Sequence, residues 1–226
     1  MKASDSRLGI PQRRVAAYVD GFNLYFGLRD SGLRRYLWLD PVALTISLLR
    51  PDQQLVALRY FTTRISGGKG QGRDPLHQQR EEKRVRQSTY IDALSTLPML
   101  STHFGHFLEK KQTCHACKSV WYRHEEKKTD VLIASQMLAD AFDGTCDDLM
   151  LISGDSDLAP PISMIRERFP DRRVVVAFPP ARYAMELRRT AHAYLEIGME
   201  KVRQSQLPDV VITPRGHRLH RPKKWR

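Results

Sequence analysis

The sequence predicts an α/β domain built on a mainly parallel central sheet with helices on both faces. Two apolar runs, residues 15–19 and 149–152, lack the polar alternation of a strand with one solvated face, so each is expected to be buried on both faces. An acidic residue follows each run closely, Asp20 after the first and Asp155 after the second. Strands that alternate with helical segments, as here, predict crossover connections and a parallel, doubly wound sheet.

Length and composition narrow the class of protein. A chain of 226 residues is long enough to bury a substantial core without disulfides or metals as staples. Its longest apolar runs are far too short to cross a bilayer, and its first 14 residues are polar and charged, so we expect neither a membrane span nor a signal peptide. Three cysteines do not make a disulfide framework, which favours a reducing, cytoplasmic setting.

The chain is strongly basic, with a formal net charge of +12. An excess of this sign favours polyanionic partners such as nucleic acid. We divide the chain into a basic extension (1–14), one domain (15–200) and a basic tail (201–226). The tail is interpreted either as a solvated or disordered segment or as one that adds salt-sensitive affinity for RNA. Its last dozen residues include Arg215, Arg218, Arg221, Lys223, Lys224 and Arg226.

The first half of the chain supplies three expected strands and three expected helices. Gly21 permits a sharp turn after Asp20, and Asn23 opens the next helix as a cap or supporting amide. Asp40 is a typical N-cap with proline at the first helical position, and Pro51 prevents that helix from continuing. The expected elements are strands over 15–19, 55–63 and 103–108 and helices over 24–29, 41–49 and 75–97.

Between these elements lies a glycine-rich basic loop, residues 66–73. It could cradle phosphate, but it lacks the closing Gly-Lys-Ser/Thr of a P-loop, so a flexible surface loop is the alternative. Basic residues here, on the following helix and near residue 180 are candidates for contact with an RNA backbone. They are Lys69, Arg73, Arg80, Arg84, Arg86 and Arg182.

A Cys-x-x-Cys motif, Cys114 and Cys117, lies in a predicted insertion near residues 110–125. Two thiolates at this spacing can hold one zinc ion from a tight turn, and His124 is a candidate third ligand, with further histidines nearby. The alternative is a pair of reduced cysteines that flank a hairpin. A structural zinc is therefore one of two interpretations of this insertion.

The second half of the chain continues the alternation of helices and strands. Apolar residues at positions 131, 134, 138, 141 and 142 mark one face of a helix that Asp130 precedes. Pro160 and Pro161 fit only in the first turn of a helix, where backbone N–H groups lack intrahelical partners. The expected elements are helices over 131–142, 162–169 and 183–191 and strands over 149–152, 173–178 and 194–197, the last at an edge of the sheet.

Four acids therefore follow strands or open a helix: Asp20, Asp130, Asp155 and Asp157. Ligands of open α/β sheets bind at the carboxyl ends of strands, and carboxylates gathered there repel unless a proton or a cation relieves them. A hard cation such as Mg²⁺ or Mn²⁺ prefers oxygen ligands and could activate water for attack on a phosphodiester. The structural alternative is that these residues only cap turns and helices.

Three blocks, residues 19–25, 126–131 and 152–158, together resemble the signature of NYN domains, specifically the LabA-like branch of the PIN-like ribonuclease superfamily. The resemblance runs from about residue 15 to 197 and implies a PIN-like, Rossmann-like three-layer α/β/α sandwich. It implies that the four acids bind divalent metal for RNA hydrolysis, with Asn23 and Ser153 as polar supports. Two departures are Leu158, where the family often has Phe, and Lys128, where it often has Gly.

The function expected from this resemblance is a metal-dependent ribonuclease that cleaves single-stranded RNA endonucleolytically. We expect RNA as the partner and Mg²⁺ or Mn²⁺ as the cofactor, with no nucleotide cofactor and no membrane contact, and a homodimer stays open. One alternative is a non-catalytic RNA-binding module. Another is a phosphohydrolase of the haloacid dehalogenase type, which is disfavoured because that chemistry normally needs a second aspartate at position 22, where this chain has Phe.

Overall fold

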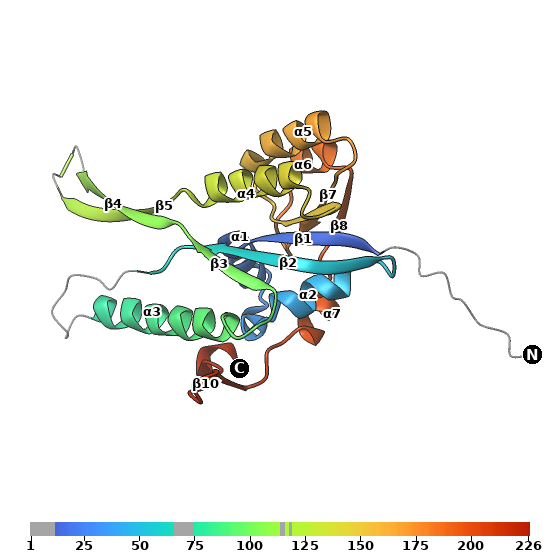
Figure 1. Cartoon of the computed structure of the whole chain (residues 1–226). Coiled ribbons are helices and arrows are strands. Elements are labelled where there is room, and N and C mark those ends of the chain that lie inside the picture. Colours follow the sequence, from blue (N-terminus) through green and yellow to red (C-terminus); the bar gives the residue numbers. More distant parts are fainter. Residues whose placement is uncertain (1–11, 66–74, 114–115, 118) are drawn as a thin grey trace, which may run out of the picture.

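The computed structural model describes residues 12–65, 75–113, 116–117 and 119–226. Its centre is a six-stranded sheet in which every neighbouring pair is parallel (Figure 1). The predicted α/β class with a mainly parallel sheet is confirmed. The strands, in their order across the sheet, are β3 (Leu100–Phe104), β2 (Gln53–Thr62), β1 (Arg13–Asp20), β6 (Asp148–Ile152), β7 (Arg173–Phe178) and β8 (Ala193–Glu196).

Helices cover both faces of this sheet and make it the middle of three layers (Figure 1). Successive side chains of a strand point to opposite faces, and β1 shows this directly: Val15, Ala17 and Val19 enter one core, whereas Ala16 and Tyr18 enter the other. The first core includes residues of α1 (Gly21–Asp30), α2 (Pro41–Leu48), α3 (Pro75–Leu94) and α7 (Met199–Gln204). The second includes residues of α4 (Thr129–Asp143), α5 (Ala159–Arg168) and α6 (Met185–Thr190).

The strand expected over residues 103–108 is wrong as a single element. β3 ends at Phe104, and the chain then leaves the central sheet after a last bond from the Gly105 N–H to the Thr62 carbonyl (2.9 Å). β4 (His106–Thr113) and β5 (Val120–Lys127) form a separate antiparallel hairpin that projects from the body of the molecule (Figure 1). A continuous run of strand-forming residues cannot show where its pairing partner changes.

Residues 201–226 are folded against the domain, so their interpretation as a disordered tail is wrong, although most of their basic side chains are exposed to solvent. This segment contains the end of α7, the small antiparallel pair β9 (Val210–Ile212) and β10 (Arg218–His220), and a 3-10 turn, η3 (Lys223–Trp225). Trp225 is only 7% exposed and packs against Trp38 and Tyr90, with ring centres 6.4 and 5.8 Å away. Burial of this one large aromatic ring anchors the segment while its basic side chains remain exposed.

Short 3-10 turns complete the described secondary structure: η1 (Arg34–Tyr36) follows α1, and η2 (Ser156–Leu158) precedes α5. No helix among the described residues is both long and apolar enough to span a bilayer.

Candidate metal centre

Three acidic side chains meet at the carboxyl edge of the central sheet. Asp20 ends β1, and Asp155 follows the end of β6. β1 and β6 are neighbouring parallel strands, with Val19 opposite Ile152, so their carboxyl ends lie together. Asp130 reaches the same place from the first turn of α4. One carboxylate oxygen from each acid lies within 4.8 Å of the others. We call Asp20, Asp130 and Asp155 the acid cluster.

A hydrogen-bond network fixes two members of the acid cluster. The Ser153 hydroxyl donates to Asp20 Oδ2 (3.0 Å) and accepts from the backbone N–H of Asp155 (3.1 Å). The backbone N–H of Asn23 donates to Asp20 Oδ1 (2.9 Å), while its side-chain oxygen accepts from the Gly154 N–H (2.8 Å). Ser153 is fully buried and Asp20 is 5% exposed. Asn23 and Ser153 thus tie the loop after β6 to the end of β1 and the first turn of α1.

The surroundings of Asp130 disfavour the charged form of its carboxyl. Partial burial of its carboxyl, followed by the charges of Asp155 and Asp157, raises the pKa of Asp130 above its usual value. A bound cation would relieve this repulsion without protonation. The donor set consists of carboxylate oxygens with no imidazole or thiolate, which suits a hard cation such as Mg²⁺ or Mn²⁺.

Asp157, the fourth predicted ligand, is not part of the acid cluster. The chain turns into η2 directly after Asp155, and the backbone N–H of Asp157 donates to Asp155 Oδ1 (3.1 Å). This turn leaves Asp157 exposed, outside the group of three. Its predicted role as a metal ligand stays a prediction. Its charge still acts on Asp130, as the pKa of Asp130 shows.

The acid cluster lines a cavity of about 290 Å³. Sequence reasoning missed three of its lining residues, Phe22, Phe26 and Thr129. The two phenylalanines are one helical turn apart on α1, and that spacing was the available signal. Arg182 also lines the cavity, and its guanidinium forms an ion pair with Asp30 (2.5 Å). Its Nε is buried and has no hydrogen-bond partner among the described residues.

Gly154 lets two segments approach each other beside the acid cluster. A Cβ at this position would lie 2.9 Å from the backbone carbonyl carbon of Arg182 and 3.0 Å from the backbone nitrogen of Tyr183. Any larger residue would push these atoms away. Gly154 therefore allows Arg182 to reach the acid cavity.

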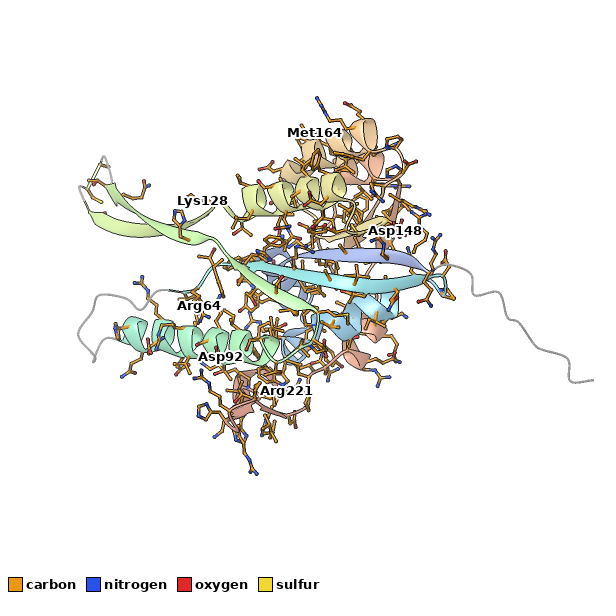
Figure 2. All side chains as sticks on the ribbon, viewed as in Figure 1. Arg64, Asp92, Lys128, Asp148, Met164 and Arg221 are labelled. Carbon is orange, nitrogen blue, oxygen red and sulfur yellow. The ribbon has the colours of Figure 1, made fainter. Side chains whose placement is uncertain are left out.

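Lys128 has a left-handed backbone conformation, with φ of +77°, immediately before α4. Glycine adopts this conformation without the steric penalty that a Cβ adds, so the Gly that the family resemblance leads one to expect here would be unstrained. The strained residue directs the chain from β5 into Thr129 and Asp130. Figure 2 labels Lys128 beside the start of α4, toward the end of the sheet opposite Asp148.

The zinc interpretation of the insertion stays a prediction. Cys117 is exposed near the end of the β4–β5 hairpin, with its sulfur 3.0 Å from the Ser119 hydroxyl. Cys114 and the His124 side chain lie outside the described part of the chain. Within the residues described, no group of three metal-binding side chains includes Cys117.

The predicted RNA-contacting residues lie in different surroundings. Arg80 is exposed on α3, Arg84 pairs with Glu81 (2.5 Å), and Arg86 pairs with Glu82 (3.3 Å). Of the four that the structure describes, Arg182 is the one that lines the acid cavity. Lys69 and Arg73 fall outside the described residues.

Comparison with known families decides the classification. The family model for the NYN domain matches residues 14–198, which include the acid cluster and the six strands of the central sheet except Arg13, the first residue of β1. The chain belongs to the NYN domain family. NYN domains fall within the PIN-like nuclease superfamily, and the acid cluster lies in this chain where the three resemblance blocks meet.

Two individual proteins resemble this NYN chain more distantly. One is "6-hydroxy-3-succinoylpyridine 3-monooxygenase HspA" of Pseudomonas putida (strain DSM 28022 / S16), 24% identical over 94% of this chain and 75% of the relative. The other is a solved structure of a protein of unknown function, VPA0982 from Vibrio parahaemolyticus. It is 17% identical, with a TM-score of 0.49, and the match covers 88% of this chain and 98% of that one.

Proposed function

We propose that the protein is a divalent-metal-dependent ribonuclease that hydrolyses phosphodiester bonds of single-stranded RNA endonucleolytically. The observation that carries the proposal is the acid cluster, in which three carboxylates from separate segments meet within 4.8 Å at the carboxyl edge of the sheet. Membership of the NYN family supports nuclease chemistry at this place. The proposal extends to the LabA-like branch, and a cytoplasmic setting and a homodimer stay predictions.

Each residue of the site has a proposed role. Asp20, Asp130 and Asp155 would hold Mg²⁺ or Mn²⁺, which supplies Lewis-acid stabilisation of charge on the scissile phosphate and lowers the pKa of water. The Ser153 hydroxyl and the Asn23 N–H fix the Asp20 carboxylate at one orientation, so little ordering is needed at the moment of reaction. Asp157 is proposed to act from the exposed rim through water.

Asp130 and Arg182 have further proposed roles, toward the attacking water and toward a phosphate of the RNA. As the alternative to direct metal contact, Asp130 would position the attacking water from its place in the acid cluster. Arg182 is the basic residue among those lining the acid cavity, and its guanidinium suits contact with a phosphate oxygen. Such a contact positions the RNA backbone without selecting its sequence.

The test is cleavage of labelled single-stranded RNA with Mg²⁺ or Mn²⁺. Asp155→Asn is expected to lower the rate about 100-fold or more, because charge stabilisation by the ion contributes several kcal/mol. Asp143→Asn, an exposed acid at the far end of α4, is the matched control and is expected to cleave like the unchanged protein. Equal cleavage in EDTA would contradict the metal mechanism.

Two other activities predict different results. A non-catalytic RNA-binding module would bind RNA but would not cleave it, whichever divalent ion is added. Monooxygenase activity, which the name of the Pseudomonas relative states for that protein, would appear as consumption of 6-hydroxy-3-succinoylpyridine in the presence of oxygen and a reductant. The acid cluster favours hydrolysis, because non-haem iron oxygenases typically combine two histidines with one carboxylate.

A further inference from the structure

A second, larger cavity adjoins the acid cavity. It has a volume of about 600 Å³, within the range of pockets that hold small organic molecules or single nucleotides. Phe22 and Phe26 line both cavities, so the two spaces share a wall on α1. An RNA strand that entered the acid cavity from the larger cavity would pass the rings of Phe22 and Phe26.

The walls of the larger cavity combine aromatic and cationic side chains. The Phe22 and Phe26 rings are stacked, with centres 6.1 Å apart, and Trp225 lies on another wall. Basic side chains include Arg34, Lys83 and Lys224, and none of the described residues that line the cavity is acidic. A guanidinium, that of Arg29, already lies 4.5 Å from the centre of the Phe26 ring. Flat rings and cations together suit a flat, anionic ligand.

The C-terminal segment supplies one wall of this cavity. Lys224 and Trp225 lie beyond residue 198, where the NYN family match ends. Packing of Trp225 on Trp38 and Tyr90 and an ion pair of Lys224 with Glu82 (2.6 Å) fix the segment against α3 and the core. The wall is therefore an addition to the family domain and a stable part of this fold.

We infer that the larger cavity is a subsite for an unpaired nucleotide adjacent to the scissile phosphate, completed by the C-terminal segment. The inference rests on the proposed function, which places the scissile phosphate at the acid cluster. The base stacks on the phenylalanine wall, and the neighbouring backbone phosphates meet Arg34, Lys83 and Lys224. A paired base cannot leave its stack to enter a cavity without unpairing, so the subsite selects single strands.

The test measures binding of a fluorescently labelled RNA hexanucleotide in EDTA, so that no cleavage occurs. Phe26→Leu removes the ring but keeps apolar bulk, and Arg34→Gln removes an exposed cation. Each is expected to weaken binding about fivefold or more, since stacking and phosphate contacts contribute on that scale. Phe142→Leu and Arg168→Gln are the matched controls on the other side of the sheet and are expected to change binding less than twofold.

Additional measurements distinguish failure of this inference from failure of the proposed function. The same sequence as a duplex is expected to bind at least tenfold more weakly, and denaturation midpoints check that each variant is folded. The inferred subsite would be overturned if Phe26→Leu and Arg34→Gln both left binding unchanged, or if the control variants lost as much affinity. It would also be overturned if the duplex bound as tightly, or if the protein bound 6-hydroxy-3-succinoylpyridine but not RNA. If RNA binding follows the expected pattern but no divalent ion supports cleavage, the proposed function fails and the nucleotide-binding cavity stands.

Discussion

Aspartates lie at both ends of the neighbouring strands β1 and β6, but their surroundings differ between the two ends. At the amino ends, Asp148 is 1% exposed and forms an ion pair with Arg13 (2.6 Å), while Asp147 pairs with Arg14 (2.9 Å). At the carboxyl ends, the acid cluster has one basic residue among those lining its cavity, and that residue pairs with Asp30. The paired acids at the amino ends join strands, whereas the acid cluster is where we propose that a cation binds.

The pKa values follow the same division. Hydrogen bonding from Arg14 lowers the pKa of Asp147, whereas partial burial and neighbouring carboxylates raise the pKa of Asp130. The ionised form of aspartate is therefore favoured at the amino end of the sheet and disfavoured at its carboxyl end. The environment supplied by the fold, and not the residue itself, separates a structural aspartate from a candidate ligand.

The largest expected difference between the carboxyl and amino ends of β1 and β6 is in stabilisation of the protein by a bound metal ion. Mn²⁺ at 100 times its dissociation constant is expected to stabilise the folded protein by about 2.7 kcal/mol, because only the folded state brings the acid cluster together. Thermal unfolding with and without Mn²⁺ measures this. Asp155→Asn is expected to lose most of the shift and Asp147→Asn to keep it, and an equal shift in both variants would remove the distinction between the ends.

Loss of the arginine that pairs with an aspartate at the amino ends is expected to lower the free energy of unfolding, while the stabilisation by Mn²⁺ stays unchanged. Arg13→Gln leaves the buried Asp148 carboxylate with Gln53, whose amide donates to it (2.6 Å). Because the Arg13 side chain is itself 39% exposed, we expect a moderate loss of about 1–3 kcal/mol in urea unfolding. Arg50→Gln, which breaks the exposed Arg50–Asp52 pair, is the control and is expected to cost less than about 0.5 kcal/mol.

The smallest expected effects concern pH and have opposite signs at the two ends. The lowered pKa of Asp147 means that its stabilisation is present above about pH 4 and is lost as the pH falls, so Asp147→Asn destabilises the protein at pH 7. The raised pKa of Asp130 means that its contribution is favourable at low pH and is lost as the pH rises, so Asp130→Asn is mildly stabilising at pH 7 without metal.

Unfolding of both variants in EDTA between pH 3 and pH 7 measures these effects. Each change is expected to stay below about 1 kcal/mol after solvent screening and to become smaller as the pH falls below about 4. Destabilisation by Asp130→Asn at pH 7 would show that its carboxylate is already compensated within the fold, which would contradict the contrast between the two ends.

The sequence determined the local parts of this protein. Uninterrupted apolar runs predicted strands buried on both faces, and β1 and β6 contribute to both cores. Acids that follow such strands predicted a cluster at one edge, and Asp20 and Asp155 are neighbours because β1 and β6 pair directly. These features follow from residue spacing and from the rule that parallel strands end at a common edge.

Only the tertiary structure decided which segments meet. The position of Asp130 depends on how the β4–β5 hairpin and the left-handed Lys128 deliver α4 to the sheet, and the position of Asp157 depends on a 3-10 turn. The C-terminal segment became a cavity wall because Trp225 finds an aromatic site on Trp38, far along the chain. Periodicity reports the environment along one segment, whereas these contacts depend on packing between segments that are distant in sequence.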